Sequence, residues 1–497
     1  MPGFAAPCRR DTALNADKDR RRMANGFALA GIADLVTEWD RAVLQFTASL
    51  IPPRRQAVAA LATALLLGAC ARYRADPLPV APAGPVMRNV LRDAAAIQRP
   101  FLRPVTIAPG QPLDPNAIAA IAVVANPDLV ALRARAGVAE AQAFAAGLLP
   151  DPTFGAGFDS ILRGPDPVPN ITGNLGFSLA ALRSRASVLA RAKASARQVR
   201  LDLAWAEWQT AGQARIQTVR VLALAQVVEM QRLTRDASVA MLDRMLRAAG
   251  REDLSPDHLQ AARLASFDAN DRLRIAERYL ATARIELTRL LGLPAGTGLA
   301  LTAPAFSVPR IDAGQLARAA ETDRFDLQAL RSGYDAQEAG VRKAILDQFP
   351  TLDLTLNLTR DTTPNTLLGP GIAFTLPLWN RNRGGVAIEQ ATRSALKAEY
   401  GARLAQLRAD IAGADAAIML GIRQRGDVLR TLPPLEQLAA ATARAAARGD
   451  LAPATAVAAA QVVRDKRTQL AQIEQDIGEK RIGLELLSGS LEEAWRR

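Results

Sequence analysis

Two kinds of hydrophobic pattern alternate along the chain, one with the period of a strand and one with the period of a helix. Residues 351–359 read Thr-Leu-Asp-Leu-Thr-Leu-Asn-Leu-Thr. This strict alternation predicts a β-strand with leucine on one face and polar side chains on the other. Similar alternation over 153–160, 170–179 and 366–378 predicts three more strands. An ordinary soluble hairpin with one buried face remains an alternative for these segments.

Long stretches with helical periodicity separate the strand pairs. Residues 183–249 and 383–449 are each predicted as one unbroken helix, about 100 Å long at ~1.5 Å per residue. An apolar stripe at spacings of three and four, which includes Met241, predicts one packed face and one wet face. Two of the shorter predicted helices, placed end to end, match one long helix in length, so a wall of paired helices follows. The shorter helices are expected at 117–149, 255–291, 313–349 and 452–488.

The chain contains an internal duplication. Leu175–Leu179 matches Ile372–Leu376, and Asp253–Pro256 matches Asp450–Pro453 at the same spacing along the chain. Each half reads as helix, strand, strand, helix, helix, which is typical of a repeated supersecondary unit. The predicted organisation is a signal or precursor segment at 1–69, an N-terminal linker at 70–116, a first repeat at 117–292, an inter-repeat segment at 293–312, a second repeat at 313–489 and a C-terminal tail at 490–497.

Four strands cannot close a barrel within one chain. Because unpaired backbone groups at an open sheet edge are costly in lipid, strands that lie in a membrane need partners from other copies. Three copies would supply twelve strands, which is an allowed even number. In such a shared barrel the leucines contact lipid. The candidate lumen residues are then Asp353, Thr355 and Asn357.

Composition narrows the function classes. Apolar residues make up 49% of the chain and aromatic residues only 4%, which suits long helices better than a wide globular core. The net charge of +13 is dispersed, so we expect no nucleic-acid binding. The chain has no nucleophile elbow, P-loop or HExxH motif, so we expect no enzyme. With one histidine, His258, which we interpret as a surface residue beside a turn, we expect no metal site and no cofactor.

The segment 54–70 reads as a secretory signal. Two arginines precede about a dozen apolar residues, and small residues follow. Leu67–Cys70 (Leu-Gly-Ala-Cys) resembles a bacterial lipobox, in which the chain is cut before the cysteine, so Cys70 is the predicted lipid attachment site. Ala71, in place of an aspartate, favours the outer membrane. A buried helix with a chance cysteine is the alternative, and a translation start nearer Leu50 would explain the position of the signal.

Three sets of residues resemble the TolC-type outer membrane efflux family over residues 115–490. They are the strand-to-helix run Phe374–Gly385 (Phe-Thr-Leu-Pro-Leu-Trp-Asn-Arg-Asn-Arg-Gly-Gly), the helix opening Asn126–Leu129, and the two Asp-Leu-Ser/Ala-Pro turns. The first half departs from the family pattern, because Leu179–Arg183 lacks the Pro-Leu-aromatic run. Leu376–Gly384 looks particularly like the cobalt–zinc–cadmium efflux subgroup, although the chain offers little metal chemistry.

The resemblance implies a fold and a set of partners. The fold is mainly α with transmembrane β: a TolC-like duct with a long periplasmic α-barrel, a shared twelve-stranded β-barrel from a homotrimer with four strands per protomer, and a belt around its middle. The partners are a periplasmic adaptor protein and an inner-membrane pump, expected to be proton-driven, together with outer membrane lipid. The function is then the outer membrane channel of a tripartite efflux system, lipid-anchored in that membrane. A periplasmic helical scaffold or adaptor that does not span the membrane is the alternative.

The resemblance also implies a periplasmic gate at the two helix–turn–helix tips. Threefold symmetry would turn Asp253 and Asp450 into rings of carboxylate, and interchain Arg–Asp pairs would hold the tips shut. The simpler interpretation is that Asp253, Ser255 and Asp450 cap the helices that follow them. The candidate gate residues are Asp253, Asp450, Arg247, Arg251, Arg444 and Arg448.

Overall fold

The computed structural model divides the chain into residues 1–82 and residues 83–497, and every element below lies in the second unit. The predicted signal and Cys70 lie outside the described residues, as do Asp253 and Leu254. The residues that the structure describes are 73–78, 87–108, 110–160, 162–163, 169–252, 255–304, 311–361 and 365–496.

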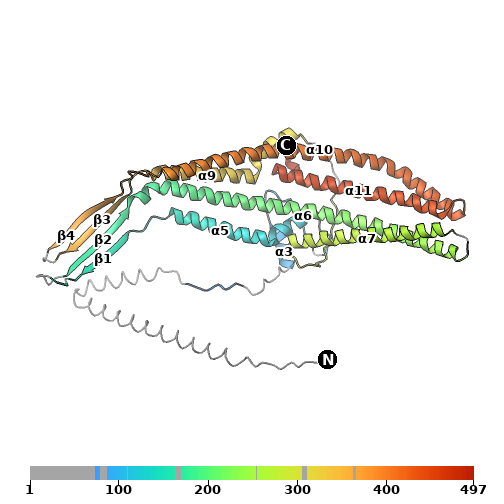
Figure 1. Ribbon diagram of the computed structural model, residues 1–497, viewed down its shortest axis with the longest axis horizontal. Helices are drawn as coiled ribbons and strands as arrows, with labels where there is room; N and C mark the ends of the chain where they lie inside the picture. Colours follow the sequence, from blue (N-terminus) through green and yellow to red (C-terminus); the bar gives the residue numbers. More distant parts are fainter. Residues whose placement is uncertain are drawn as a thin grey trace, which may run out of the picture. The chain divides into compact units, whose positions relative to one another are not determined.

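Two long helices run the length of this unit. Helix α6 (Leu179–Ala249) has 71 residues and α10 (Arg383–Arg448) has 66, which corresponds to about 100 Å each. A sheet lies at one end of the unit, and the turns from α6 to α7 and from α10 to α11 lie at the other end (Figure 1). The predicted long helices are therefore confirmed. The expectation that they hold no internal proline is wrong, because α10 contains Pro433 and Pro434 in its interior.

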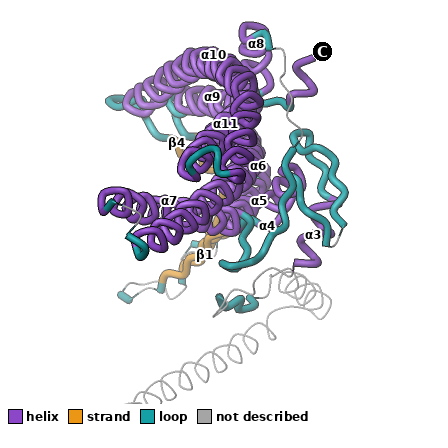
Figure 2. The backbone as a smooth tube through the Cα atoms, turned by 90° about the vertical axis from the view of Figure 1, so that its right-hand side faces the viewer, coloured by secondary structure: helices purple, strands orange, loops and turns teal. Residues whose placement is uncertain are grey.

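Shorter helices pack beside the long ones. Helix α6 packs against α5 (Pro127–Gly147), α7 (Pro256–Leu290), α9 (Phe325–Leu346) and α11 (Pro453–Ser488), and α10 packs against α9 and α11. Figure 2 shows these helices side by side as an arc that runs from α7 through α6 and α11 to α10. The expected wall of paired helices is thus present in one chain. The remaining helices are α3 (Met87–Ala96), α4 (Pro115–Ala125), α8 (Ala313–Asp323) and the short 3₁₀ helix η1 (Glu492–Arg496).

The helix that opens each repeat is broken, contrary to the prediction of single helices at 117–149 and 313–349. The breaks fall at Asn126, between α4 and α5, and at Arg324, between α8 and α9. Asn126 Oδ1 accepts a hydrogen bond from the N–H of Leu129 (3.1 Å), and its Nδ2 donates to Leu290 O (2.9 Å). In the second repeat, Arg324 Nη1 donates to Leu487 O (3.3 Å). Each break is therefore fastened to the end of the helix that closes the same repeat.

The four strands form one antiparallel sheet in the order β1-β2-β3-β4. They are β1 (Thr153–Asp159), β2 (Asn170–Ser178), β3 (Leu352–Arg360) and β4 (Thr366–Phe374), and all four predicted strands are confirmed. The last strand ends at Phe374 instead of residue 378, because the chain turns at Leu378, whose N–H donates to Leu376 O (2.9 Å). In the first repeat no proline follows the strand, so α6 begins directly after β2.

The apolar core lies where the interrupted helices meet. Ile118 and Ile121 of α4 pack with Leu280 and Leu287 of α7 in one cluster, and α8, α10 and α11 form a second cluster around Leu484. The loop after α3 crosses between them, since Phe101 packs edge-on against Trp208 and Phe325, with ring centroids 5.7 and 6.0 Å apart. This middle region is therefore the most densely buried part of the unit.

Candidate functional site

The sheet separates apolar and polar side chains onto opposite faces. Along β3, Leu354 lies opposite Phe177 and Ile372, and Leu358 lies opposite Leu368. These side chains are exposed in the single chain; Leu368, for example, is 68% exposed. A sheet with one continuous apolar face that no described part of its own chain covers needs an apolar environment from outside.

The other face of the sheet carries the predicted lumen residues. Asp353 pairs with Ser178 and Ala373, Thr355 with Gly176 and Gly371, and Asn357 with Asn174 and Gly369. Every neighbour of these three residues in the register is thus small or polar. The register brings Asp353, Thr355 and Asn357 together on one face, as expected; their contact with a lumen remains a prediction.

Glycine is required on this polar face where long side chains lie over the backbone. A Cβ added at Gly371 would lie 2.5 Å from Thr355 Oγ1 and 2.7 Å from Asn357 Nδ2. At Gly157 it would lie 2.5 Å from Thr172 Oγ1. Any larger residue would therefore push polar side chains off the sheet.

The helix tips place the predicted gate residues at the surface. Arg448 Nε donates to Asp450 Oδ2 (2.8 Å) within the same chain, and Arg247 pairs with Asp243 one turn earlier in α6. Arg444 is exposed near the end of α10, and Arg251 lies in the turn after α6. Arg247 and Arg448 thus pair within their own chain, whereas the interchain pairs remain a prediction. Asp253 lies outside the described residues.

The capping interpretation of these tips is wrong for the described residues. Ser255 is the N-cap of α7 but its side chain accepts no capping hydrogen bond; its Oγ instead lies 3.3 Å from His258 Nδ1. The N-cap of α11 is Ala452, not Asp450. Proline at the first turn of each helix fixes the backbone for helix entry without a capping side chain.

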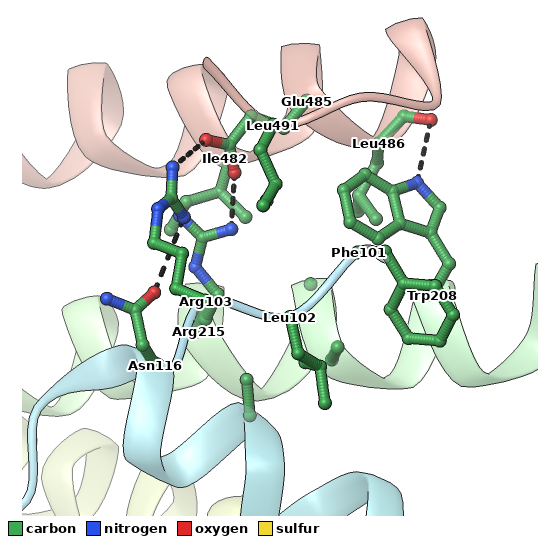
Figure 3. A pocket seen from close by; sticks show the side chains of 13 residues that line it. Phe101, Leu102, Arg103, Asn116, Trp208, Arg215, Ile482, Glu485, Leu486 and Leu491 are labelled. Atoms are coloured by element: carbon green, nitrogen blue, oxygen red, sulfur yellow. Dashed lines mark hydrogen bonds and ion pairs between the residues drawn. The ribbon is translucent and has the colours of Figure 1, made fainter. Parts of the chain in front are cut away.

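A buried ion cluster that the sequence did not predict lies in the middle region (Figure 3). Glu485 of α11 is 4% exposed and accepts from Arg103 Nη2 at 2.6 Å. Arg215 of α6 pairs with the other oxygen of the same carboxylate. Arg103 also pairs with Glu493 (2.8 Å) and contacts Asn116 (3.4 Å). One carboxylate therefore fastens the N-terminal linker, the central helix and the C-terminal segment together.

Charge keeps this cluster ionised. Burial of Glu485 disfavours its charged form, but the guanidinium groups of Arg215 and Arg103 outweigh that effect and hold the pKa of Glu485 below its ordinary 4.5. The hydrogen bond from Arg103 likewise lowers the pKa of Glu493. On the side of Trp208, the cavity beside the cluster has a volume of about 10 Å³, which leaves room for no more than one water molecule. A second, open cavity of about 300 Å³ borders Arg103, Glu485 and Glu493 on the side of Pro304 and Gly478.

A second buried carboxylate repeats this arrangement nearby. Glu207 of α6 is 3% exposed and pairs with Arg99 (2.9 Å) and Arg133 (2.7 Å). Trp208, the next residue, donates from Nε1 to Leu486 O (3.3 Å). No local pattern could have revealed either cluster, because the partners come from distant parts of the chain.

The described residues include no group of three or more side chains suited to hold a metal ion. Among them, no single helix is long and apolar enough to cross a bilayer; α4 and α5 pass that test only as a pair, across a bend of 49°.

The comparisons with known proteins agree with this geometry. Residues 316–490 match the family model of the outer membrane efflux protein. This match covers most of the second repeat, including both strands β3 and β4 and the tip at Asp450. A search among curated protein sequences found no match.

Solved outer membrane channels share the fold. The outer-membrane channel OprN has 15% identity and a TM-score of 0.64, and the match covers 86% of this chain and 100% of that chain. VceC from Vibrio cholerae has 15% identity and a TM-score of 0.62 (76% and 96% covered). CusC, whose crystal structures concern folding and transmembrane channel formation, has 15% identity and a TM-score of 0.61 (80% and 99% covered).

The chain has the fold of a protomer of TolC-type outer membrane channels, including a two-faced sheet. Residues 316–490, which make up most of the second repeat, match the outer membrane efflux protein family. Both findings favour the efflux channel over the periplasmic scaffold considered as the alternative. Members of this family and fold are channels, not enzymes.

Proposed function

We propose that three copies of the chain close into one channel that carries small solutes or metal ions from the periplasm to the exterior. The observation that carries this proposal is the pair of free edges in the single chain. The sheet ends at β1 on one side and at β4 on the other. The helix series ends with α5 and α7 on the side of β1 and with α10 on the side of β4.

Both edges need the same partner. A strand edge in lipid leaves backbone N–H and C=O groups unpaired, each at a cost of several kcal/mol. Pairing β4 of one copy with β1 of the next removes every edge, and the same rotation brings α10 beside α5 and α7. Twelve strands from three copies make an even-numbered barrel of known size class. A head-to-tail interface of this kind, between two different edges of identical chains, can close a ring.

Location and partners extend the proposal. Lipid attachment at Cys70 would hold the linker at the inner leaflet of the outer membrane, with the helices extending into the periplasm. The helix tips would face a periplasmic adaptor and an inner-membrane pump, which we take to be proton-driven. The channel itself needs no cofactor, because conduction requires only a lumen of suitable width and polarity.

The helix tips would form the periplasmic gate. Because Arg448 and Asp450 are exposed, their pair within one chain is worth only about 0–1 kcal/mol. Asp450 can therefore exchange Arg448 of its own chain for an arginine of the next chain at little cost in free energy. Asp450→Asn is expected to raise the open probability of single channels in planar bilayers, with Asp427→Asn, an exposed pair on α10 away from the tip, as the matched control.

Interchain disulfides test the closed ring. A single cysteine at Gly155 in β1 is combined in turn with cysteines at positions 367 to 373 of β4, in a chain whose Cys8 is replaced by serine. We expect one register to give trimers that resist heating in detergent until a reductant is added. Cysteines placed only in β2 and β3 should give cross-links within one chain. A chain that fractionates as a soluble monomer would refute the proposal.

A further inference from the structure

The segment between β4 and α10 exposes large apolar side chains that no described residue of the chain covers. Leu376 is 63% exposed, Leu378 58% and Trp379 87%. They continue the apolar face of β4, where Ile372 and Phe374 are also exposed. The exposed apolar side chains therefore extend past the end of the strand and finish at Trp379.

A strained turn holds this segment in place. Arg381 and Asn382 adopt left-handed backbone conformations, with φ of 46° and 47°, which are unfavourable for residues with a Cβ. Asn382 Nδ2 donates to Ala344 O of α9 (2.9 Å), and the N–H of Arg383 donates to Asn380 O (3.0 Å). The Asn382 amide lies over Gly385, where a Cβ would come within 3.0 Å of its Cγ. Strain of this kind persists only where the surrounding contacts fix it, and it often marks a functional segment.

Two exposed cations follow the tryptophan. Arg381 Nε donates to Pro377 O (3.3 Å), so its guanidinium folds back towards the apolar part of the segment. Arg383 is exposed at the first turn of α10. Neither guanidinium has an acidic partner among the described residues.

The first repeat lacks this arrangement. Leu182 stands where Trp379 stands in the second repeat. The following Arg183 donates to Phe349 O and Pro350 O (3.3 and 3.1 Å) and lies 5.8 Å from the centre of the Phe349 ring. Its charge is therefore held against the protein, whereas the side chains of Arg381 and Arg383, which follow Trp379, are exposed. This difference between two equivalent positions shows that packing of the strand-to-helix junction does not itself need an exposed Trp-Arg segment.

The height of the sheet places this segment at a membrane boundary if the barrel forms. A strand of 9 residues such as β3, rising ~3.3 Å per residue and tilted ~40°, spans roughly 23 Å along the membrane normal, close to the ~25 Å apolar band of a membrane barrel. Trp379 lies five positions beyond the last residue of β4. The order along the chain is thus leucine, tryptophan, arginine, which matches hydrocarbon, interface and headgroup along the normal.

We propose that Leu376–Arg383 is a membrane-interface anchor that binds phospholipid of the periplasmic leaflet, with Trp379 at the level of the glycerol groups and with Arg381 and Arg383 on anionic headgroups. The proposal rests on the membrane-spanning barrel of the proposed function. One such anchor per chain gives three per channel, at alternate strand-to-helix junctions of the two repeat types.

Quenching by brominated phospholipid tests the position of Trp379. Trimers reconstituted with lipid brominated on the upper acyl carbons are compared with Trp379→Phe trimers. We expect wild-type fluorescence to be quenched in part and the quenched component to disappear in Trp379→Phe, because Trp208 is 2% exposed and Trp205 and Trp495 lie in the middle region. The fifth tryptophan, Trp39, lies in the predicted precursor segment, which the cut before Cys70 removes. Leu182→Ala, the matched change in the first repeat, should leave the quenching unchanged. Equal quenching of wild type and Trp379→Phe would overturn the proposal.

Titration in mixed micelles tests the headgroup preference. Brominated phosphatidylglycerol should half-saturate the quenching at lower concentration than brominated phosphatidylcholine, and Arg381→Gln/Arg383→Gln should reduce that preference by up to about fivefold for each arginine, equivalent to ~1 kcal/mol. Equal half-saturation by the two lipids would overturn the anionic-headgroup assignment.

A neighbouring copy is the competing occupant. A high-yield disulfide between Trp379→Cys of one chain and Leu148→Cys of the next, with no lipid quenching, would assign the segment to the protomer interface and overturn the proposal. Gels that detect heat-labile trimers distinguish failure of the anchor from failure of the proposed function. Intact trimers whose Trp379 is not quenched contradict only the anchor, whereas absence of trimers contradicts the proposed function.

Discussion

Glu485 illustrates what single residues contribute to this protein. It lies on α11, nearly inaccessible to solvent, and it joins Arg103 of the linker to Arg215 of the central helix. The sequence shows only a glutamate in a Leu-rich helix, which predicts an ordinary solvated charge. The faces of the sheet, in contrast, could be predicted from the sequence. Asp353, Thr355 and Asn357 share a face as expected, because strand alternation is a local property. Long-range ion pairs have no local signature.

Glu485→Gln should destabilise the channel strongly. The amide keeps the shape of the side chain but leaves Arg215 without its charged partner and Arg103 with only the exposed Glu493, at a cost of about 3–5 kcal/mol. We expect a marked fall in the temperature at which trimers dissociate in detergent. Glu493→Gln, at a carboxylate that is 67% exposed, should change that temperature little. Equal effects of the two substitutions would contradict the attachment role of Glu485.

The same carboxylate predicts a pH dependence. The folded-state pKa of Glu485 is lowered below 4.5, so its contribution to stability is fully present above the unfolded value and is lost as the pH falls through the folded value. Between pH 7 and pH 5, Glu485 should therefore not alter the temperature at which trimers dissociate. Below about pH 4.5 that temperature should fall, because Glu485 becomes protonated. A wild-type profile that coincides with that of Glu485→Gln at every pH would contradict this assignment.

At the scale of elements, the two repeats are similar in outline and different at their junctions. Helix ends and strands were predicted to within a few residues, because proline-led helix starts and glycine-led helix ends are local signals. The breaks at Asn126 and Arg324 were missed. The Asn-Pro pair at the first break is a helix-start signal, but it lies inside a continuous helical pattern; nothing in the sequence marks the second, which depends on its contact with α11.

Gly292 and Gly489 end the closing helix of each repeat with positive φ. A Cβ at Gly292 would lie 2.5 Å from Ala125 O, at the break between α4 and α5, whereas Gly296 also has positive φ but has nothing within 4 Å. Gly292→Ala and Gly296→Ala both incur the left-handed cost of about 1–2 kcal/mol. Gly292→Ala should cost at least ~1 kcal/mol more. The order of thermal dissociation temperatures checks this, and equal temperatures would show that the close approach at the break is unimportant.

At the scale of the whole molecule, the proposed assembly makes the single chain an open segment of a larger ring. The sequence predicted this from the number of strands, because four strands in lipid leave two edges. The helix series with the same two open ends was not foreseen, since side-by-side packing of helices depends on contacts far apart in sequence.

Adjacent residues of β3 offer a test of the assembled barrel. Leu356→Arg places a charge on the apolar face and should destabilise the inserted barrel by about 2–4 kcal/mol near its midplane. Asn357→Arg, one position further on the opposite face, should allow trimers to form while shifting ion selectivity towards anions. Heat-labile gels and reversal potentials in planar bilayers read out the two effects. Loss of trimers from both variants alike would contradict the assignment of faces.

The break at Asn126 divides the first repeat into a sheet-side half and a tip-side half, and the break at Arg324 divides the second repeat in the same way. Only one helix of each repeat continues through both halves. Helices α6 and α10 pass through the middle region, whereas α5 with α7 and α9 with α11 meet there end to end. A force applied at the tips can therefore displace α7 and α11 by rotation about those joints, without breaking a helical hydrogen bond. The same force can move α6 and α10 only by bending them, and in α10 the bend has a natural place at Pro433 and Pro434. In the proposed channel, the helix tips can thus open while the sheet end keeps its shape.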